Sequence, residues 1–135
     1  MKLQVAVEYM LIVGFALLVL LPYFLYSTDL SIRYSQENSL LDAKNSVEKL
    51  GQLADLVCSQ GEPAQVVTSI VIPSNVERIV IQNKTIEFKV RTLAGTSDIF
   101  YTTTCNVSGN LSDIRGNINV LIKAISGGVQ IEVAS

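Results

Sequence analysis

The sequence contains no histidine, and only two of its 135 residues are cysteines. Without histidine the chain lacks the commonest general base and the commonest nitrogen ligand for metals, and it has no Cys-x-x-Cys pair for zinc or redox chemistry. It has no glycine-rich phosphate loop, and its net charge of −2 offers no basic field for nucleic acid. We therefore expect a protein that is not an enzyme, with no cofactor, no metal and no nucleic-acid partner.

Charged residues make up only 16% of the chain, and they are absent from one long stretch. After Glu8 the next charged residue is Asp29, so twenty consecutive residues carry no charge. A helix of this length spans about 30 Å, which is the hydrocarbon thickness of a bilayer. The sequence therefore predicts a membrane-spanning helix, and Lys2 in front of it predicts a cytoplasmic N-terminus. The remainder is long enough for one small domain of about a hundred residues.

Two ordinary kinds of N-terminal segment have this hydropathy, and each leaves something unexplained. A cleaved secretory signal has a shorter apolar region and an Ala-x-Ala site, whereas this run ends in Pro22-Tyr-Phe-Leu-Tyr26 with no such site after it. A plain membrane anchor fits better, and Tyr23 and Tyr26 resemble interfacial aromatic residues. A plain anchor does not account for Glu8, because an ionised carboxylate in hydrocarbon costs about 2.5–3.5 kcal/mol.

The residues around Glu8 provide a more specific interpretation. Residues 4–12 read Gln-Val-Ala-Val-Glu-Tyr-Met-Leu-Ile. They resemble the class III signal sequence of archaeal type IV pilins, whose pattern is Gln-x-Ser-x-Glu-x-x-x-Leu. Ala6 stands in place of the common serine, and Ile12 in place of the leucine.

The resemblance implies a cleavage site, an assembly contact and a set of partners. A prepilin peptidase would cut between Leu3 and Gln4, and the apolar helix would stay in the mature subunit. Glu8 would then meet the new α-amine of Gln4 in a neighbouring subunit. The implied protein is a structural subunit of an adhesive pilus, with other copies of itself and, before assembly, membrane lipid as partners.

The implied location is the cell membrane before assembly, with the C-terminal domain outside, and the extracellular filament afterwards. The β domain would form the filament's outer surface. Two alternatives remain open. One is a minor pilin or pseudopilin that primes assembly, and the other is a monomeric single-span surface protein.

Four segments follow from these patterns: a removed pre-sequence at 1–3, a hydrophobic helix at 4–28, an amphipathic helix at 29–60 and a strand-rich surface domain at 61–135. Apolar residues spaced by three and four mark one face of the amphipathic helix. They are Leu40, Leu41, Ala43, Val47, Leu50, Leu53, Ala54 and Val57. The resemblance favours one long helix bent at Pro22, and the alternative is two helices with a break at 27–29.

After Pro63 the pattern changes to short strands. Alternating and β-branched runs predict strands at 65–72, 76–82, 85–91, 98–105, 117–125 and 129–133, with Gly127-Gly128 as the turn of a closing hairpin. The expected fold is α+β, in which the amphipathic helix packs on one antiparallel sheet as in a type IV pilin. The alternative is a small β-sandwich that stands apart on a helical stalk.

Two further features concern the predicted outer domain. Outside the cytoplasm the pair Cys58 and Cys105 favours a disulfide, and the alternative is two free buried thiols. Three N-glycosylation sequons begin at Asn83, Asn106 and Asn110, all in predicted turns. Modification of these asparagines is possible, and the alternative is that they serve only as turn formers.

Overall fold

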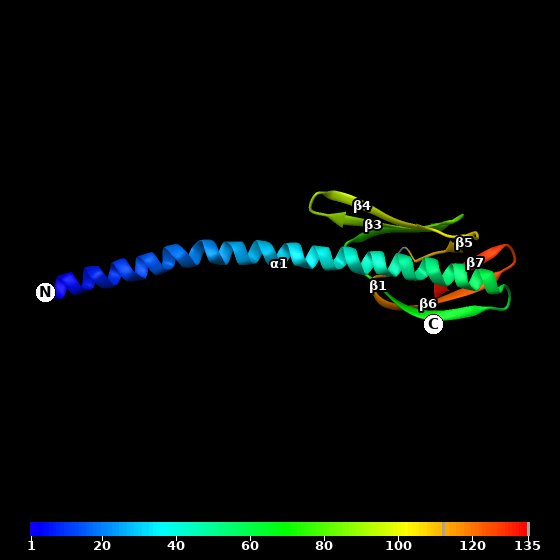
Figure 1. The fold of residues 1–135 in the computed structure, drawn as a ribbon, viewed down its shortest axis with the longest axis horizontal. Coiled ribbons are helices and arrows are strands. Elements are labelled where there is room, and N and C mark those ends of the chain that lie inside the picture. The colour runs from blue at the N-terminus through cyan, green and yellow to red at the C-terminus, as the bar shows by residue number, and fades with distance from the viewer. Residues whose placement is uncertain (112, 135) are drawn as a thin grey trace. The chain divides into compact units, whose positions relative to one another are not determined.

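The computed structural model describes residues 1–111 and 113–134, and it confirms the α+β class (Figure 1). The chain divides into two compact units, Met1–Glu37 and Asn38 to the C-terminal end. One helix is followed by seven strands. Their bounds are α1 Lys2–Gln60, β1 Gln65–Ile72, β2 Val76–Gln82, β3 Thr85–Thr92, β4 Gly95–Thr102, β5 Val107–Gly109, β6 Gly116–Ile125 and β7 Gly128–Val133.

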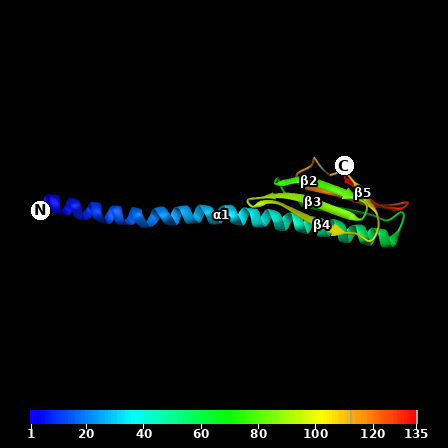
Figure 2. The same ribbon diagram turned by 90° about the horizontal axis from the view of Figure 1, so that it is seen from above.

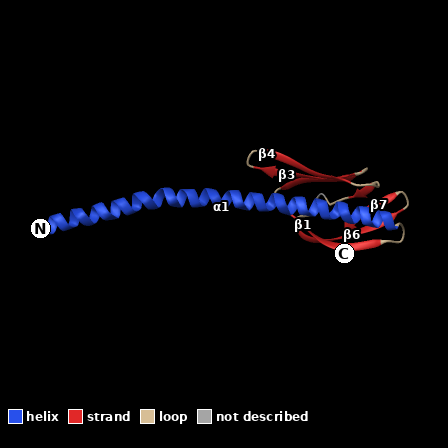
Figure 3. Cartoon of the chain, viewed as in Figure 1, coloured by secondary structure: helices blue, strands red, loops and turns tan. Residues whose placement is uncertain are grey.

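Helix α1 has no break at 27–29 and continues through Pro22 (Figure 3). A break would have used Thr28 as a capping residue. Instead the Thr28 hydroxyl donates to the carbonyl oxygen of Phe24 at 3.0 Å, a bond to the preceding turn that is typical of a threonine inside a helix. Pro22 removes one backbone donor, yet the residues on both sides of it keep helical geometry.

The strands form two sheets rather than the single predicted one. Four strands are ordered β1-β6-β7-β5, and three are ordered β2-β3-β4. All neighbours are antiparallel except β5, which pairs with β7 in parallel. Figure 2 shows β2, β3 and β4 side by side. The difference arises after Pro73, because β1 pairs with β6 and the chain crosses to start a second sheet with β2.

The C-terminal part of α1 shares one hydrophobic core with both sheets. Figure 1 shows this part of α1 between β3 and β4 on one side and β1 and β6 on the other. Fully buried side chains come from all three layers: Val47, Leu50 and Val57 from the helix, Ile72, Val120, Ile122 and Ile131 from one sheet, and Ile86, Phe88 and Val90 from the other.

The predicted apolar face of the helix is correct except at Leu41, which is 55% exposed. Successive helical residues are separated by 100° around the axis, so Leu41 lies on the far side from the buried Val47 and Leu50. Two small residues that the apolar pattern missed, Ser46 and Gly51, are buried instead. Both lie where the helix contacts a strand.

Helix α1 contacts the edge strand of each sheet. The Ser46 hydroxyl donates to the Val71 carbonyl at 2.6 Å and accepts from the Val71 amide at 3.2 Å, while the Lys49 ammonium donates to the Ser69 carbonyl at 2.8 Å. Side chains of the helix therefore form hydrogen bonds with backbone groups of the edge strand β1 that would otherwise lack a partner in the protein. On the other sheet, the ring of Tyr101 in β4 lies directly against Gly51.

Replacement of Gly51 by alanine should destabilise the C-terminal unit by about 1–3 kcal/mol, because the new methyl group would overlap the Tyr101 ring. Thermal unfolding of the full chain in detergent, followed by near-ultraviolet circular dichroism, measures the loss. Gly14→Ala is the matched control, since no heavy atom lies within 4 Å of its added methyl group. Equal unfolding midpoints for the two variants would show that the close packing of Gly51 is unimportant.

Candidate functional site: the apolar segment of helix α1

The apolar segment, defined as residues 3–26 of α1, exposes its large hydrophobic side chains all the way around the helix. The least exposed of them, Val13, still has 41% of its surface accessible. A helix that is hydrophobic on every side is not stable in water, so lipid or other protein must cover it. In length and composition α1 is able to cross a membrane, and the segment is compatible with membrane anchoring.

Aromatic residues lie toward both ends of the apolar segment. Tyr9 follows Glu8 near the N-terminal end, and Tyr23 and Tyr26 lie near the other end. The axial distance from Tyr9 to Tyr26 is about 25 Å at 1.5 Å per residue. Tyrosine prefers the two headgroup regions of a bilayer, and this separation suits a span with one tyrosine at each interface.

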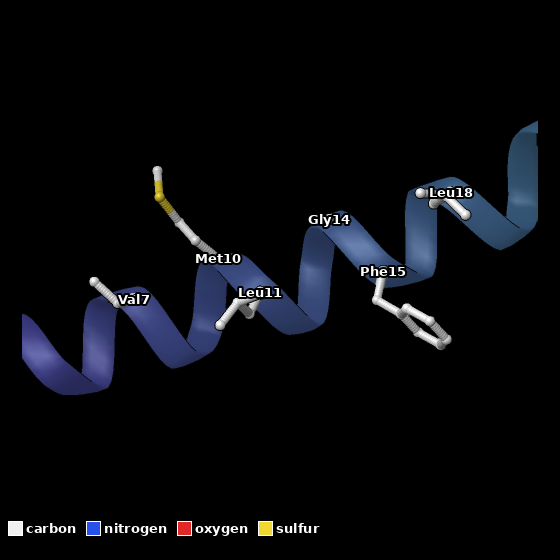
Figure 4. Close-up of a pocket in the computed structure, with 6 residues that line it drawn as sticks. All are labelled: Val7, Met10, Leu11, Gly14, Phe15 and Leu18. Carbon is white, nitrogen blue, oxygen red and sulfur yellow. The ribbon is translucent and has the colours of Figure 1, made fainter.

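Two shallow grooves interrupt the surface of the apolar segment. The first is centred on Gly14, where the missing side chain leaves a depression, and Met10 and Phe15 point away from it on opposite sides (Figure 4). Its other lining residues are Val7, Leu11 and Leu18. The second groove is lined by Leu17, Leu20, Leu21, Tyr23 and Phe24. Grooves of this kind accept side-chain ridges when helices pack together.

Glu8 is the only acidic residue of the apolar segment, and it makes no ion pair with any residue that the structure describes. Gln4 precedes it by one helical turn, so the two side chains lie on the same face. Leu3 and Gln4 both belong to the first turn of α1. Cleavage between them, and pairing of Glu8 with a new α-amine, stay predictions.

The two cysteines, far apart in the sequence, are joined. Cys58 and Cys105 form a disulfide with their Cα atoms 6.4 Å apart, within the usual range for such bonds. The bridge ties the last turns of α1 to the segment that follows β4. The preference for a disulfide over two free thiols is therefore confirmed.

Asp55, one turn before Cys58, makes a second link between the same two parts of the chain. One carboxylate oxygen accepts hydrogen bonds from the Thr104 amide at 2.8 Å and the Thr104 hydroxyl at 3.0 Å, and the other accepts from the Tyr101 hydroxyl at 3.0 Å. No sequence pattern predicted a role for Asp55. The available signal was a carboxylate on the helix three residues before a cysteine, which identifies no partner by itself.

The hydrogen bond to Asp55 raises the pKa of Tyr101 above its ordinary value of 10.0, because it favours the protonated phenol. Desolvation of the phenol and the negative charges of Asp55 and Glu48 act in the same direction. Tyr101 therefore stays a hydrogen-bond donor throughout the physiological pH range.

The three sequon asparagines all lie on the surface of the C-terminal unit. Asn83 is in the turn between β2 and β3, Asn106 directly precedes β5, and Asn110 follows β5. The third sequon ends at residue 112, which lies outside the described residues.

Comparisons with known proteins found no similar protein. No family model, curated protein or solved structure matches the chain. Within residues 1–111 and 113–134 no group of three cysteine, aspartate or glutamate side chains is arranged to hold a metal ion. We therefore infer the function of the chain from the chemistry of the apolar segment and the surface of the C-terminal unit.

Removal of the disulfide in a Cys58→Ala, Cys105→Ala double variant should lower the free energy of unfolding of the C-terminal unit by about 4 kcal/mol. The reason is that the bridge closes a long loop, with a sequence separation of 47, and so restricts the unfolded chain. Denaturant titration with and without a reducing agent measures this effect. Wild type under reducing conditions should approach the double variant. A wild type that is insensitive to the reductant while its thiols become titratable would contradict the prediction.

Alkaline pH should weaken the link between Tyr101 and Asp55. Because the folded pKa of Tyr101 lies above the unfolded value, the stabilisation is complete below pH 10.0 and is lost as the pH rises through the folded pKa. Tyr101→Phe should lose about 1 kcal/mol at neutral pH. The stability gap between wild type and variant should close at high pH, as measured by denaturant titration across the range. A gap that stays constant would count against the assigned hydrogen bond.

Proposed function

We propose that this chain is a pilin-like subunit that assembles into a filament through its apolar segment. The observation that carries the proposal is an apolar helix that is exposed on every side, holds one unpaired carboxylate and leads into a folded α+β unit. Membrane lipid covers the helix before assembly, and the same segment of other copies covers it afterwards. The C-terminal unit then faces the surroundings and provides the surface for adhesion.

The energetics of Glu8 support assembly over a permanently lipid-embedded monomer. Transfer of the apolar side chains from lipid to a helical core changes their hydrophobic free energy little, because both environments are apolar. The carboxylate differs, since an unpaired charge is costly in hydrocarbon and a positive partner relieves that cost. Cleavage between Leu3 and Gln4 supplies such a partner, the α-amine of a neighbouring copy. Pairing therefore favours the assembled state specifically.

The two grooves support contacts with more than one neighbour. The groove at Gly14 and the groove beside Leu20 and Phe24 lie at different heights on α1 and, at 100° per residue, are centred on different faces. Packing a different face at each height joins copies by heterologous contacts, which extend into open helical assemblies rather than closed dimers. The tyrosines near both ends of the segment favour a competing function, a monomeric single-span surface protein.

Glu8→Ala should leave membrane insertion intact and lower the yield of sheared filaments by more than about tenfold, since loss of about 1.4 kcal/mol per contact changes an association constant tenfold. Glu37→Ala is the matched control, a charge removal on an exposed part of the same helix outside the apolar segment. Sedimentation of sheared material and immunoblotting of the membrane fraction measure both quantities.

N-terminal sequencing of the same material separates the competing functions. Filament protein that starts at Gln4 supports the proposed subunit. Protein that still starts at Met1, remains in the membrane fraction and forms no filaments would establish the monomeric anchor instead.

A further inference from the structure

Two of the sequon asparagines, far apart in the sequence, lie next to each other in the C-terminal unit. The amide of Val107 donates to the carbonyl oxygen of Asn83 at 2.5 Å, and the amide of Thr103 donates to the carbonyl oxygen of Lys84 at 2.8 Å. The segment 103–107 therefore runs alongside the turn between β2 and β3. Asn106 directly precedes Val107 in the chain, so its backbone lies beside that of Asn83.

The hairpin turn between β6 and β7 meets the same place. The amide of Val129 donates to the carbonyl oxygen of Asn106 at 2.8 Å, and a side chain at Gly128 would collide with that oxygen. The disulfide from Cys58 reaches Cys105, the neighbour of Asn106. We call this meeting of the 83–84 turn, the 103–107 segment and the 126–129 turn the turn cluster. It lies at the end of the C-terminal unit where α1 ends.

The side chains of Asn83 and Asn106 are exposed, and their amide groups make no hydrogen bond with any residue that the structure describes. Two other asparagines of the unit differ, because the Asn75 amide donates to the Arg91 carbonyl and the side-chain oxygen of Asn117 accepts from the Ser69 hydroxyl. Asn83 also has a positive φ of 55°, a conformation typical of asparagine at a tight turn. Its backbone, not its side chain, carries the structural role.

Each of these two asparagines is followed two residues later by a hydroxyl residue, Thr85 or Ser108, which completes an acceptor sequon. The hydroxyl groups of Thr85 and Ser108 make no hydrogen bond within the described part of the chain. Asn110 is different, since it takes part in an interaction within the protein. All three asparagines are exposed, so this interaction is what separates the third sequon from the first two.

We propose that Asn83 and Asn106 carry N-linked glycans that together cover the turn cluster. In the reaction the side-chain amide nitrogen bonds to the anomeric carbon of a glycan carried on a polyisoprenoid phosphate. The bond from that carbon to the phosphate oxygen breaks, the lipid phosphate leaves, and the amide nitrogen loses one proton. No oxidant or reductant is required. The inference rests on the export of the C-terminal unit, which is part of the proposed function.

Glycans at these positions have two structural consequences. They shield the half-buried Cys58–Cys105 bridge and the adjoining turns from reductants and proteases. They also keep the end of the C-terminal unit out of tight contacts between subunits, because bulky hydrophilic sugars cannot be buried in a packed interface. Subunit contacts of the C-terminal unit are then confined to its other surfaces.

Intact mass and glycopeptide mapping of the protein from its native cells test the proposal. Thr85→Ala and Ser108→Ala should each remove one glycan and leave the asparagine in place, and the double variant should lose both. Ser108→Thr preserves the sequon and should keep its glycan. Asn119→Gln changes an exposed asparagine outside any sequon and should leave the mass unchanged apart from the substitution itself.

A second measurement separates failure of this inference from failure of the proposed function. Labelling of intact cells with a membrane-impermeant amine reagent reports export, because Lys84 is exposed in the turn cluster itself. A labelled but unmodified wild type, or glycan found at Asn110 alone, would overturn the glycan inference and leave the filament proposal standing. A wild type with neither label nor glycan would overturn both.

Discussion

The packing of the C-terminal part of α1 against two edge strands is the contact on which the rest of the structure depends. Ser46 and Lys49 donate hydrogen bonds to backbone carbonyl groups of β1, and Gly51 allows the Tyr101 ring of β4 to approach the helix. On the far side, β2 and β5 bring the two sheets together directly. Without the helix, the inner faces of both sheets would lose their common cover, and the apolar segment would no longer lead into a folded unit.

The two parts of α1 therefore differ in how their apolar residues are distributed around the helix. In the C-terminal unit its apolar residues form a single face, and small residues appear where a strand comes close. In the apolar segment no face is polar, and the side chains remain accessible all around. The first pattern specifies a unique intramolecular partner. The second specifies only an apolar environment, which either lipid or a neighbouring helix satisfies, and the proposed move from membrane to filament requires that freedom.

Local patterns in the sequence predicted the elements well and their arrangement less well. The bounds of β1 and β2 and the end of α1 at Gln60 agree with the prediction, because β-branched runs, Gly61 and Pro63 are strong local signals. Strand β5 was missed, since three residues are too few for an alternating pattern. The division into two sheets was missed because β1 pairs with β6, which lies far from it in the sequence, and a local pattern does not indicate such a pairing.

In the candidate sites, too, the sequence indicated individual residues better than it indicated which residues lie together. The even number of cysteines in a domain expected outside the cytoplasm predicted the disulfide, but nothing predicted the role of Asp55, whose partners Tyr101 and Thr104 lie far along the chain. The sequons were visible as motifs, yet only the backbone bonds of residues 103–107 bring Asn83 and Asn106 together. Leu41 was misplaced because its spacing suited the apolar face only approximately.

The order β1-β6-β7-β5 has a consequence for the sequence of folding events. The strands β2, β3 and β4 are consecutive hairpins, so their sheet needs only local contacts and can form as soon as residue 102 is free. The other sheet has β7 in its interior, although β7 follows every other strand in the sequence. As the chain is synthesised from its N-terminal end, β1 therefore stays unpaired until β6 is complete at residue 125, and β5 stays unpaired until β7 is complete at residue 133.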